Sequence, residues 1–334
     1  MRTVKVLSLC FFINLAGMVF SYYQPLAVLK SPEPDPSELF SCSVSVSKDF
    51  ALVAAKNKDG FGAVYVYKFS HGSWIYTQTL YSPFPAADEN FGADVDINNQ
   101  TVAICAPGSE KLYVYQYNGS DFSDAPFVLT DSDPCSVGFA SAVDISDNYI
   151  VVGSSMDLEK RGSALLFEYD GFSYNRIAKF IASDSSPARP QFAHPGDLFG
   201  SSVAVDAGSA RVVIGSQNHD LTGSQDHLRY HGAVYVFDCN QIDNTWPETE
   251  TYKLTAPTFC DEDYFAADID LAGDTLVVGV PGYDGKYFDQ GIVYVFQCVR
   301  SQWTCLAIDN PRRSSFDFFG SSVAIDADTI AVGS

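Results

Sequence analysis

The stretch Phe199-Gly-Ser-Ser-Val-Ala-Val-Asp206 decides the fold, because it returns almost unchanged as Phe319-Gly-Ser-Ser-Val-Ala-Ile-Asp326. Weaker copies of the same pattern begin at four other phenylalanines, namely Phe40, Phe91, Phe139 and Phe265. The copies recur on average about every 56 residues, and such self-similarity indicates an architecture built from one repeated unit.

Each copy continues with further apolar runs that are separated by polar turns. In the first repeat the second run covers residues 51–55, the third 62–67 and the fourth 74–80. The same order returns along the chain, with second runs at 101–106, 149–153, 211–215, 275–280 and 329–333, third runs at 112–115, 162–167, 232–237 and 291–296, and a further fourth run at 250–254. Short alternating runs without a helical period predict four strands per unit.

We therefore predict an all-β fold, a β-propeller of four-stranded antiparallel blades. A single such sheet cannot bury both of its faces, whereas radial repetition stacks sheet on sheet and leaves only short edges. A linear solenoid is the alternative, although its units are typically shorter. Leu29-Lys-Ser-Pro32 precedes Phe40 by the same distance as Leu80-Tyr-Ser-Pro83 precedes Phe91. This spacing predicts an N-terminal strand that becomes the fourth strand of the last blade and closes the ring.

These residues resemble FG-GAP repeats, the unit of the integrin α-subunit propeller. The Phe-Gly opening is explicit at Phe91, Phe199 and Phe319, and its Gly-x-Pro counterpart is Gly279-Val-Pro281. The resemblance covers most of residues 26–334 and implies an extracellular recognition or cell-adhesion module. It also implies seven blades in the complete protein, whereas six repeats are visible. Either the chain is a fragment, or six blades close with a thin last one.

The family often carries an Asp-rich calcium loop between the first two strands of a blade. Here the corresponding turns read Asn98-Asn-Gln100 and Ser146-Asp-Asn148, which offer no cluster of oxygen ligands for Ca²⁺. We therefore predict no metal and no other cofactor.

The first 21 residues predict a signal peptide, which leaves residues 22–334 as the propeller domain. No later run is long and apolar enough to predict a membrane span. We expect a secreted, extracellular protein, or a cell-surface one if an anchor follows Ser334. The 41 acidic residues against 20 basic ones argue against a nucleic-acid partner, which needs a basic face.

Secretion predicts disulfides and glycans. Cys298 and Cys305 flank a short turn, and Cys239 and Cys260 bracket a longer segment, so we predict these two pairs as disulfide candidates. Cys42, Cys105 and Cys135 have no assigned partner. Asn99 and Asn118 begin glycosylation sequons.

Ligand contacts are expected in the loops between strands two and three and between blades, because these loops share one end of the propeller and carry the long insertions. The candidates lie in the loops of the fourth and fifth repeats: His219, Asp220, His227, Arg229, Tyr230, His231, Tyr283 and Asp284. A solvated polar loop is the plainer interpretation of the same residues. Their spacing matches no standard metal site.

An acidic residue stands two positions before the repeat phenylalanine in five copies, at Glu38, Glu89, Asp197, Asp263 and Asp317. Its regularity predicts a structural role, in which the carboxylate accepts backbone N–H bonds within the turn.

The sequence carries no nucleophile elbow, zinc-protease motif, P-loop or Rossmann glycines. We therefore expect a binding module and not an enzyme, with an extracellular protein or glycan as partner. The alternative is a secreted carbohydrate-active enzyme, a glycosidase or lyase that uses a carboxylate pair. In that case a histidine or carboxylate set would converge on the central axis.

Overall fold

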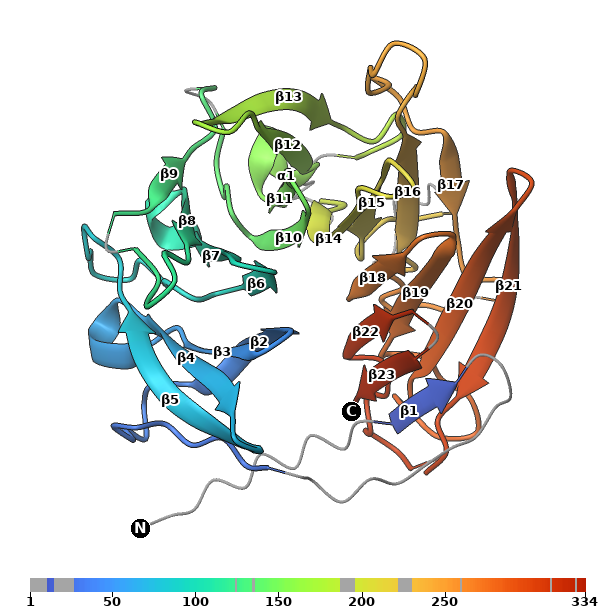
Figure 1. The fold of residues 1–334 in the computed structure, drawn as a ribbon. Coiled ribbons are helices and arrows are strands. Elements are labelled where there is room, and N and C mark those ends of the chain that lie inside the picture. Colours follow the sequence, from blue (N-terminus) through green and yellow to red (C-terminus); the bar gives the residue numbers. More distant parts are fainter. Residues whose placement is uncertain are drawn as a thin grey trace.

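The computed structural model describes residues 11–14, 27–123, 125–133, 136–186, 196–221, 230–258, 260–312, 314–327 and 329–334. Within these residues the strands form six antiparallel sheets, five of four strands and one of three, arranged radially around a common axis (Figure 1). The prediction of an all-β, propeller-like fold is therefore confirmed. We number the sheets as blades 1 to 6 in chain order.

The first strand of each blade lies innermost and the last outermost. Blade 1 contains β2 (Phe40–Ser47), β3 (Phe50–Ala55), β4 (Ala63–Ser70) and β5 (Ser73–Leu80); blade 2 contains β6 (Val95–Asn98), β7 (Thr101–Ala106), β8 (Lys111–Gln116) and β9 (Phe127–Leu129); blade 3 contains β10 (Ala142–Ser146), β11 (Tyr149–Ser154), β12 (Ser163–Tyr169) and β13 (Tyr174–Phe180). Blade 4 contains β14 (Phe199–Asp206), β15 (Arg211–Ser216), β16 (Ala233–Asp238) and β17 (Tyr252–Leu254); blade 5 contains β18 (Ile269–Ala272), β19 (Thr275–Val280), β20 (Ile292–Val299) and β21 (Gln302–Asp309); blade 6 contains β22 (Ser322–Asp326), β23 (Thr329–Gly333) and β1 (Phe11–Asn14).

The core lies between neighbouring blades. The repeat phenylalanine enters this space, and five of the six copies are fully buried: Phe91, Phe139, Phe199, Phe265 and Phe319. A glycine at the start of the preceding blade's third strand meets it through a parallel backbone bridge, as between Gly62 and Phe91 or Gly291 and Phe319. Three pairs of neighbouring blades are thus joined by the most regular residues of the repeat, through Gly62, Gly162 and Gly291.

Blade 1 packs against blade 2 on one face, but among the residues that the structure describes its other face does not pack against blade 6. Contacts link the inner strands in order from β2 to β6, β10, β14, β18 and β22, and none of comparable extent joins β22 back to β2 in the described residues. Val44 and Val46 on β2 remain 62% and 64% exposed, whereas the equivalent Val95 and Ile97 on β6 are each 4% exposed. Blades 1 and 6 are therefore the two open ends of the ring.

The N-terminal region differs from the prediction. Residues 29–32 form no strand and do not join the last blade. They lie against blade 1, where the Tyr67 hydroxyl donates to the Lys30 carbonyl oxygen at 2.6 Å and Leu29 packs beside Tyr65 and Tyr67. The open apolar face of blade 1 supplies these partners close by in sequence, so the segment is held there. Blade 6 instead pairs β23 with β1.

β1 belongs to the predicted signal peptide, and the other residues of that segment lie outside the described ones. Among the helices that the structure describes, none is long and apolar enough to cross a membrane.

Candidate functional site

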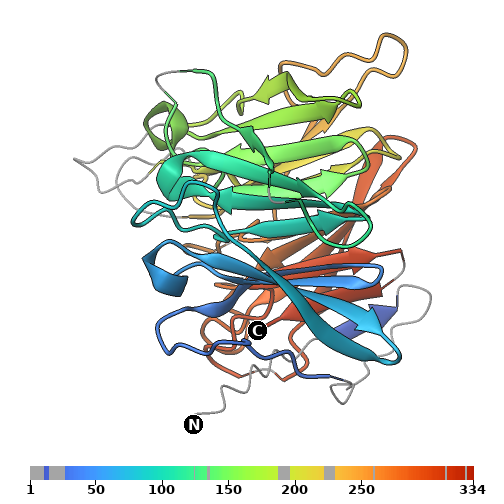
Figure 2. The ribbon, with the colours of Figure 1, turned by 60° about the vertical axis from the view of Figure 1, so that its left-hand side comes forward.

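The propeller has two ends, which differ in their connections. The turns between strands one and two and between strands three and four form the turn end. The connections between strands two and three and from blade to blade form the loop end, which includes the short helix α1 (Asp157–Lys160) and lies on the left of Figure 2.

At the loop end, the last residues of the loop between β15 and β16 in blade 4 lie against the connection from β17 to β18, which leads from blade 4 to blade 5. The N–H of Tyr264 donates to the Tyr230 carbonyl at 2.9 Å, and that of Phe265 to the His231 carbonyl at 3.1 Å. The Tyr230 and Tyr264 rings stack, with centroids 5.3 Å apart and planes 15° apart. Because both rings are half-buried, the pair presents an aromatic edge at the surface.

His219 lies beneath this surface with both ring nitrogens occupied. Nδ1 is 2.9 Å from an Asp197 carboxylate oxygen, and Nε2 is 2.8 Å from Lys253 Nζ. Lys253 also pairs with Asp184, which accepts the Tyr235 hydroxyl at 2.8 Å. Only about 5% of His219 is exposed, so this network fixes the start of the loop, residues 216–221.

His231 has a similar internal position and is 1% exposed. Its Nδ1 accepts the Leu221 N–H at 3.3 Å and lies 3.4 Å from Asp220 Oδ1. Its Nε2 lies 3.6 Å from Asp261 Oδ1. The ring therefore connects the loop of blade 4 to the acidic connection of blade 5.

Three carboxylates gather in that connection and the adjacent loop. Burial raises the pKa of Asp263 to about 6, and the nearby charges of Asp284 and Asp261 add to the effect. Asp263 Oδ2 accepts the Cys260 N–H, whereas Oδ1 is buried and has no hydrogen-bond partner among the described residues. Asp261 and Asp284 are exposed, so this part of the loop end is strongly anionic.

The structure divides the predicted contact residues into three groups. His219, Asp220 and His231 are largely enclosed, Tyr230 and Tyr283 are half-buried, and Asp284 is exposed. His227 and Arg229 lie outside the described residues. Sequence reasoning missed Tyr264, which joins the surface through its ring contact with Tyr230. The acidic triplet 261–263 was the available signal for this connection.

The prediction for the repeated acidic residue is confirmed in four blades, where a turn N–H donates to Glu89, Asp197, Asp263 or Asp317. Glu89 also accepts the Ser82 and Tyr113 hydroxyls at 2.9 Å each and is fully buried. Blade 3 lacks this acid. There Asp157 accepts the Ser163 hydroxyl at 2.7 Å and pairs with Lys179 at 3.0 Å.

A second group of carboxylates lies along the axis, on the inner strands of blades 2, 3 and 5 or directly before them: Asp94, Asp96, Asp144, Asp268 and Asp270. Each accepts a main-chain N–H from the inner strand of the following blade. These aspartates therefore carry part of the contact between blades.

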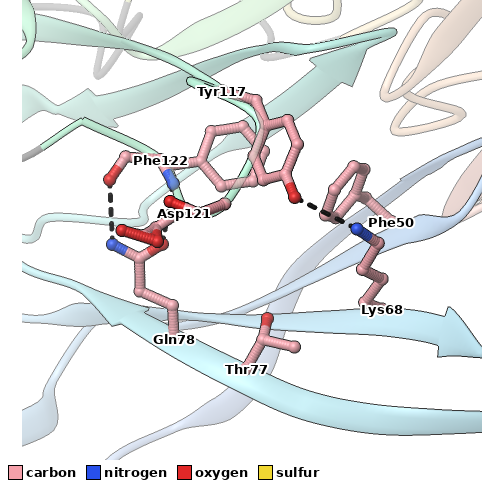
Figure 3. Close-up of a pocket in the computed structure, with 8 residues that line it drawn as sticks. Phe50, Lys68, Thr77, Gln78, Tyr117, Asp121 and Phe122 are labelled. Atoms are coloured by element: carbon pink, nitrogen blue, oxygen red, sulfur yellow. Dashed lines mark hydrogen bonds between the residues drawn. The ribbon is translucent and has the colours of Figure 1, made fainter.

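A cavity of about 180 Å³ lies at the turn end between blades 1 and 2 (Figure 3). The polar groups that line it hydrogen-bond to one another. Gln78 Nε2 donates to the Phe122 carbonyl at 3.0 Å, and the Phe122 N–H donates to Gln78 Oε1 at 2.9 Å. Lys68 donates to the Tyr117 hydroxyl at 3.1 Å and lies over the Phe50 ring. These contacts hold the loop between β8 and β9 against blade 1.

The predicted disulfides are not formed. The described cysteines 42, 105, 239, 260, 298 and 305 are all free thiols. Across β20 and β21 the register places Cys298 opposite Trp303 and Cys305 opposite Phe296, so the two cysteines do not face each other. Both sequon residues, Asn99 and Asn118, are exposed at the turn end. In the described part of the chain, no three His, Cys, Asp or Glu side chains are grouped as a metal site.

Comparisons with known proteins bear on the fold and the repeat. No curated protein matches this chain. A solved Lactobacillus plantarum protein is similar over 91% of this chain and 83% of its own, with 11% identity and a TM-score of 0.53. A Bacteroides uniformis protein, provisionally named a 6-phosphogluconolactonase, is similar over 80% of this chain and 70% of its own, with 13% identity and a TM-score of 0.52. At such identities these likenesses show the fold alone.

The sequence pattern of the FG-GAP repeat family matches residues 249–296. This range covers the outer strand of blade 4 and the first three strands of blade 5, which include the acidic connection at the loop end. Residues 249–296 therefore match an FG-GAP repeat, and an integrin-α-like propeller is compatible with this repeat.

Proposed function

We propose that the chain is an extracellular recognition module, and not an enzyme, that binds a protein or glycan through the loop end of blades 4 and 5. The observation that carries the proposal is the stacked Tyr230–Tyr264 pair beside the exposed carboxylates of Asp261 and Asp284. Tyrosines give a large contact area with a polar tip and are favoured at interfaces. FG-GAP repeats are typical of extracellular proteins, which supports the predicted secretion.

The positions of the sequons agree with this use of the loop end. Asn99 follows β6 and Asn118 follows β8, so both belong to the turn end. Glycans attached there would cover the opposite end and leave the loop end accessible. The polar partners within the loop end also suit binding, because His219 and His231 fix the described flanks of the loop, residues 216–221 and 230–232, and reduce the ordering cost of association there.

For the fold, we propose that the complete protein forms a ring of seven blades. Its support is the uncovered face of β2, since Val44 and Val46 occupy positions that are buried against a preceding blade in blade 2. A further blade would cover the same face in the same way.

The test is a binding screen of the secreted full chain against extracellular proteins and glycans, with and without Ca²⁺. The loop-end variant carries Tyr264→Ala and Asp284→Asn. The matched control carries Phe172→Ala and Asp121→Asn, which change the same residue classes at exposed positions of the turn end. We expect the loop-end variant to lose saturable binding and the control to retain it. Equal binding by both variants would contradict the assignment.

A secreted carbohydrate-active enzyme is the second candidate, because carboxylates do converge on the axis. Against it, their oxygens already accept hydrogen bonds from the next blade. Hydrolysis or elimination of a screened glycan, abolished by Asp96→Asn, would favour this reading over the binding module.

A further inference from the structure

A second cavity, of about 490 Å³, lies at the turn end, where the turns between the first two strands of blades 1, 2 and 3 come together. Blade 1 contributes residues 48–50 to its lining, blade 2 residues 98–101, and blade 3 Asp147. Its volume lies within the range of small-molecule sites, about 300–1,000 Å³. The cavity is at the opposite end of the propeller from the surface proposed above for ligand binding.

The repeat brings three equivalent residues to this cavity. Lys48, Asn99 and Asp147 each stand first in the turn between the first two strands of their blades, and their φ values are 51°, 55° and 51°. The Asn99 N–H donates to Ser47 Oγ of blade 1 at 3.0 Å, so the turns of blades 1 and 2 are fixed to each other. Asn99 therefore belongs to the middle turn, with a cationic side chain on the turn before it and an anionic one on the turn after it.

Asn99 is also the acceptor residue of the sequon 99–101. Its Nδ2 donates to Asn98 Oδ1 at 2.6 Å. Because an amide nitrogen carries two hydrogens, one can stay in this bond while the other is replaced by a sugar. The wall of the cavity thus contains the atom to which a glycan would be attached.

The lining suits a sugar better than it suits an apolar ligand. Four exposed side chains on it make no hydrogen bond or ion pair in the described part of the chain: Lys48, Asp49, Gln100 and Asp147. They offer an ammonium donor, an amide and two carboxylate acceptors, which match the hydroxyl and acetamido groups of a sugar. Phe50 supplies an apolar part of the wall.

The second sequon provides a contrast. Asn118 Oδ1 accepts the Ser120 N–H at 2.9 Å, the Ser120 hydroxyl at 2.9 Å and the Asp121 N–H at 3.0 Å. Asn118 does not line the nearby cavity of about 180 Å³, whose polar groups hydrogen-bond to one another. A sugar on Asn118 therefore has no comparable site.

We propose that the larger cavity binds the first N-acetylglucosamine of the protein's own Asn99 glycan, which connects the turns of blades 1, 2 and 3. The proposal rests on the secretion proposed above. In the attachment, the bond from the anomeric carbon of the sugar to the diphosphate of a lipid-linked oligosaccharide breaks, a bond from that carbon to Asn99 Nδ2 forms, and Nδ2 loses one proton. The covalent link keeps the sugar at a high effective concentration beside its partners.

The first test uses the full chain secreted from eukaryotic cells, with its glycans located by mass spectrometry. An endoglycosidase that leaves one sugar on each asparagine should leave the Tm unchanged. Thr101→Val abolishes the Asn99 sequon, keeps a β-branched side chain and should lower the Tm by about 3 °C or more. Ser120→Ala abolishes the other sequon and, as the matched control, should change the Tm by about 1 °C or less. The Thr101→Val loss should disappear when both chains are made with glycan transfer inhibited.

An amidase that cleaves the bond between sugar and asparagine keeps the proposal testable if Thr101→Val does not fold. On the folded protein we expect it to release the Asn118 glycan about tenfold faster than the Asn99 glycan, and after denaturation at equal rates.

Four results would each overturn the proposal: a secreted chain without sugar at Asn99, a trimmed chain with the Tm of Thr101→Val, a Thr101→Val loss that persists without glycans, or equal release from the two folded sites. Each of them leaves the loop-end assignment in place, because that assignment is tested separately by the binding of the Tyr264 and Asp284 variant.

Discussion

The recurring glycine of one repeat contacts the phenylalanine of the next repeat. Gly291 begins the third strand of blade 5 with φ of 72°, and its backbone bridges to Phe319 of the next repeat. A Cβ at this position would lie 2.1 Å from the Phe319 carbonyl oxygen. Glycine is therefore required both by the backbone conformation and by the close approach of the next blade.

A comparison of Gly291→Ala with Gly72→Ala should distinguish the cost of the backbone conformation from the cost of the close contact between blades. Gly72 also has a positive φ, 79°, but a Cβ there would meet no atom within 4 Å. We expect Gly72→Ala to cost about 1 kcal/mol of unfolding free energy and Gly291→Ala about 3 kcal/mol or more. Urea denaturation measures both. Equal costs would mean that blades 5 and 6 are not in this contact in solution.

The repeated acid offers a second comparison at the residue scale. Asp263 keeps a buried oxygen without a hydrogen-bond partner in the part of the chain that the structure describes, and burial raises its pKa to about 6. Because its ionised form is disfavoured in the fold, stability is lost as pH rises from about 4 through 6. Asp263→Asn should therefore stabilise the protein at pH 8 by about 1 kcal/mol, after partial screening by solvent, and should give no gain at pH 4.

Glu89→Gln is the matched substitution, because Glu89 is fully buried and accepts hydroxyl and N–H donors on both oxygens. An amide nitrogen would face those donors, so we expect a loss of about 2 kcal/mol at either pH. Denaturation at pH 4 and pH 8 checks both variants. Destabilisation by Asp263→Asn at pH 8 would show that its second oxygen has a partner.

At the scale of elements, the Gln78 side chain holds the loop between β8 and β9 through hydrogen bonds to its backbone. The Gln78 amide on β5 both donates to and accepts from the Phe122 backbone, as a neighbouring strand would (Figure 3). The loop between β8 and β9 is thereby fixed to blade 1, and the rings of Phe50, Tyr117 and Phe122 pack beneath it.

Gln78→Ala should release this loop without unfolding the blades. We expect a loss of about 1–2 kcal/mol and faster amide exchange in residues 118–123. Thr77→Ala on the same strand is the control, since it leaves both Phe122 bonds in place. Unchanged exchange in the loop would mean that the aromatic packing alone holds it.

The strands themselves were predicted closely, because each blade repeats the same apolar runs. β7, β19 and β23 have the predicted bounds, and the others differ by a few residues. The N-terminal segment was assigned wrongly for a physical reason. Its spacing before Phe40 suited a strand, but Tyr65 and Tyr67 hold it against the open face of blade 1.

At the scale of the molecule, the ring has two open ends. The face of β2 is uncovered, whereas the equivalent face of β6 is buried against blade 1. Val44→Ser with Val46→Ser should change the unfolding free energy by no more than about 0.5 kcal/mol, as at ordinary surface positions. Val95→Ser with Ile97→Ser should cost about 4 kcal/mol, because both side chains are buried. Comparable losses from the two pairs in urea denaturation would show that blade 6 closes onto blade 1 in solution.

The sequence placed the candidate residues in the loop insertions, but it did not indicate which of them are exposed. The insertions placed Tyr230 and Asp284 at the loop end, as observed. His219 and His231 were expected to face a ligand, but both are enclosed, because their partners come from other parts of the chain: Asp197, Lys253 and Asp261. Spacing along the sequence carries no information on such partners.

The sequence by itself determined the repeat, the four-strand unit and the radial stacking of sheets, because a pattern of two-residue alternation and regular turns acts locally within each unit. Only the tertiary structure decided which residues of that pattern meet. It paired the glycine of one repeat with the phenylalanine of the next, enclosed the histidines of the loops and brought aspartates from three blades to one axis. These contacts depend on the rotation from blade to blade, which brings together residues from different repeats, such as Gly291 with Phe319 or Asp270 with Ile325, and leaves no local signal.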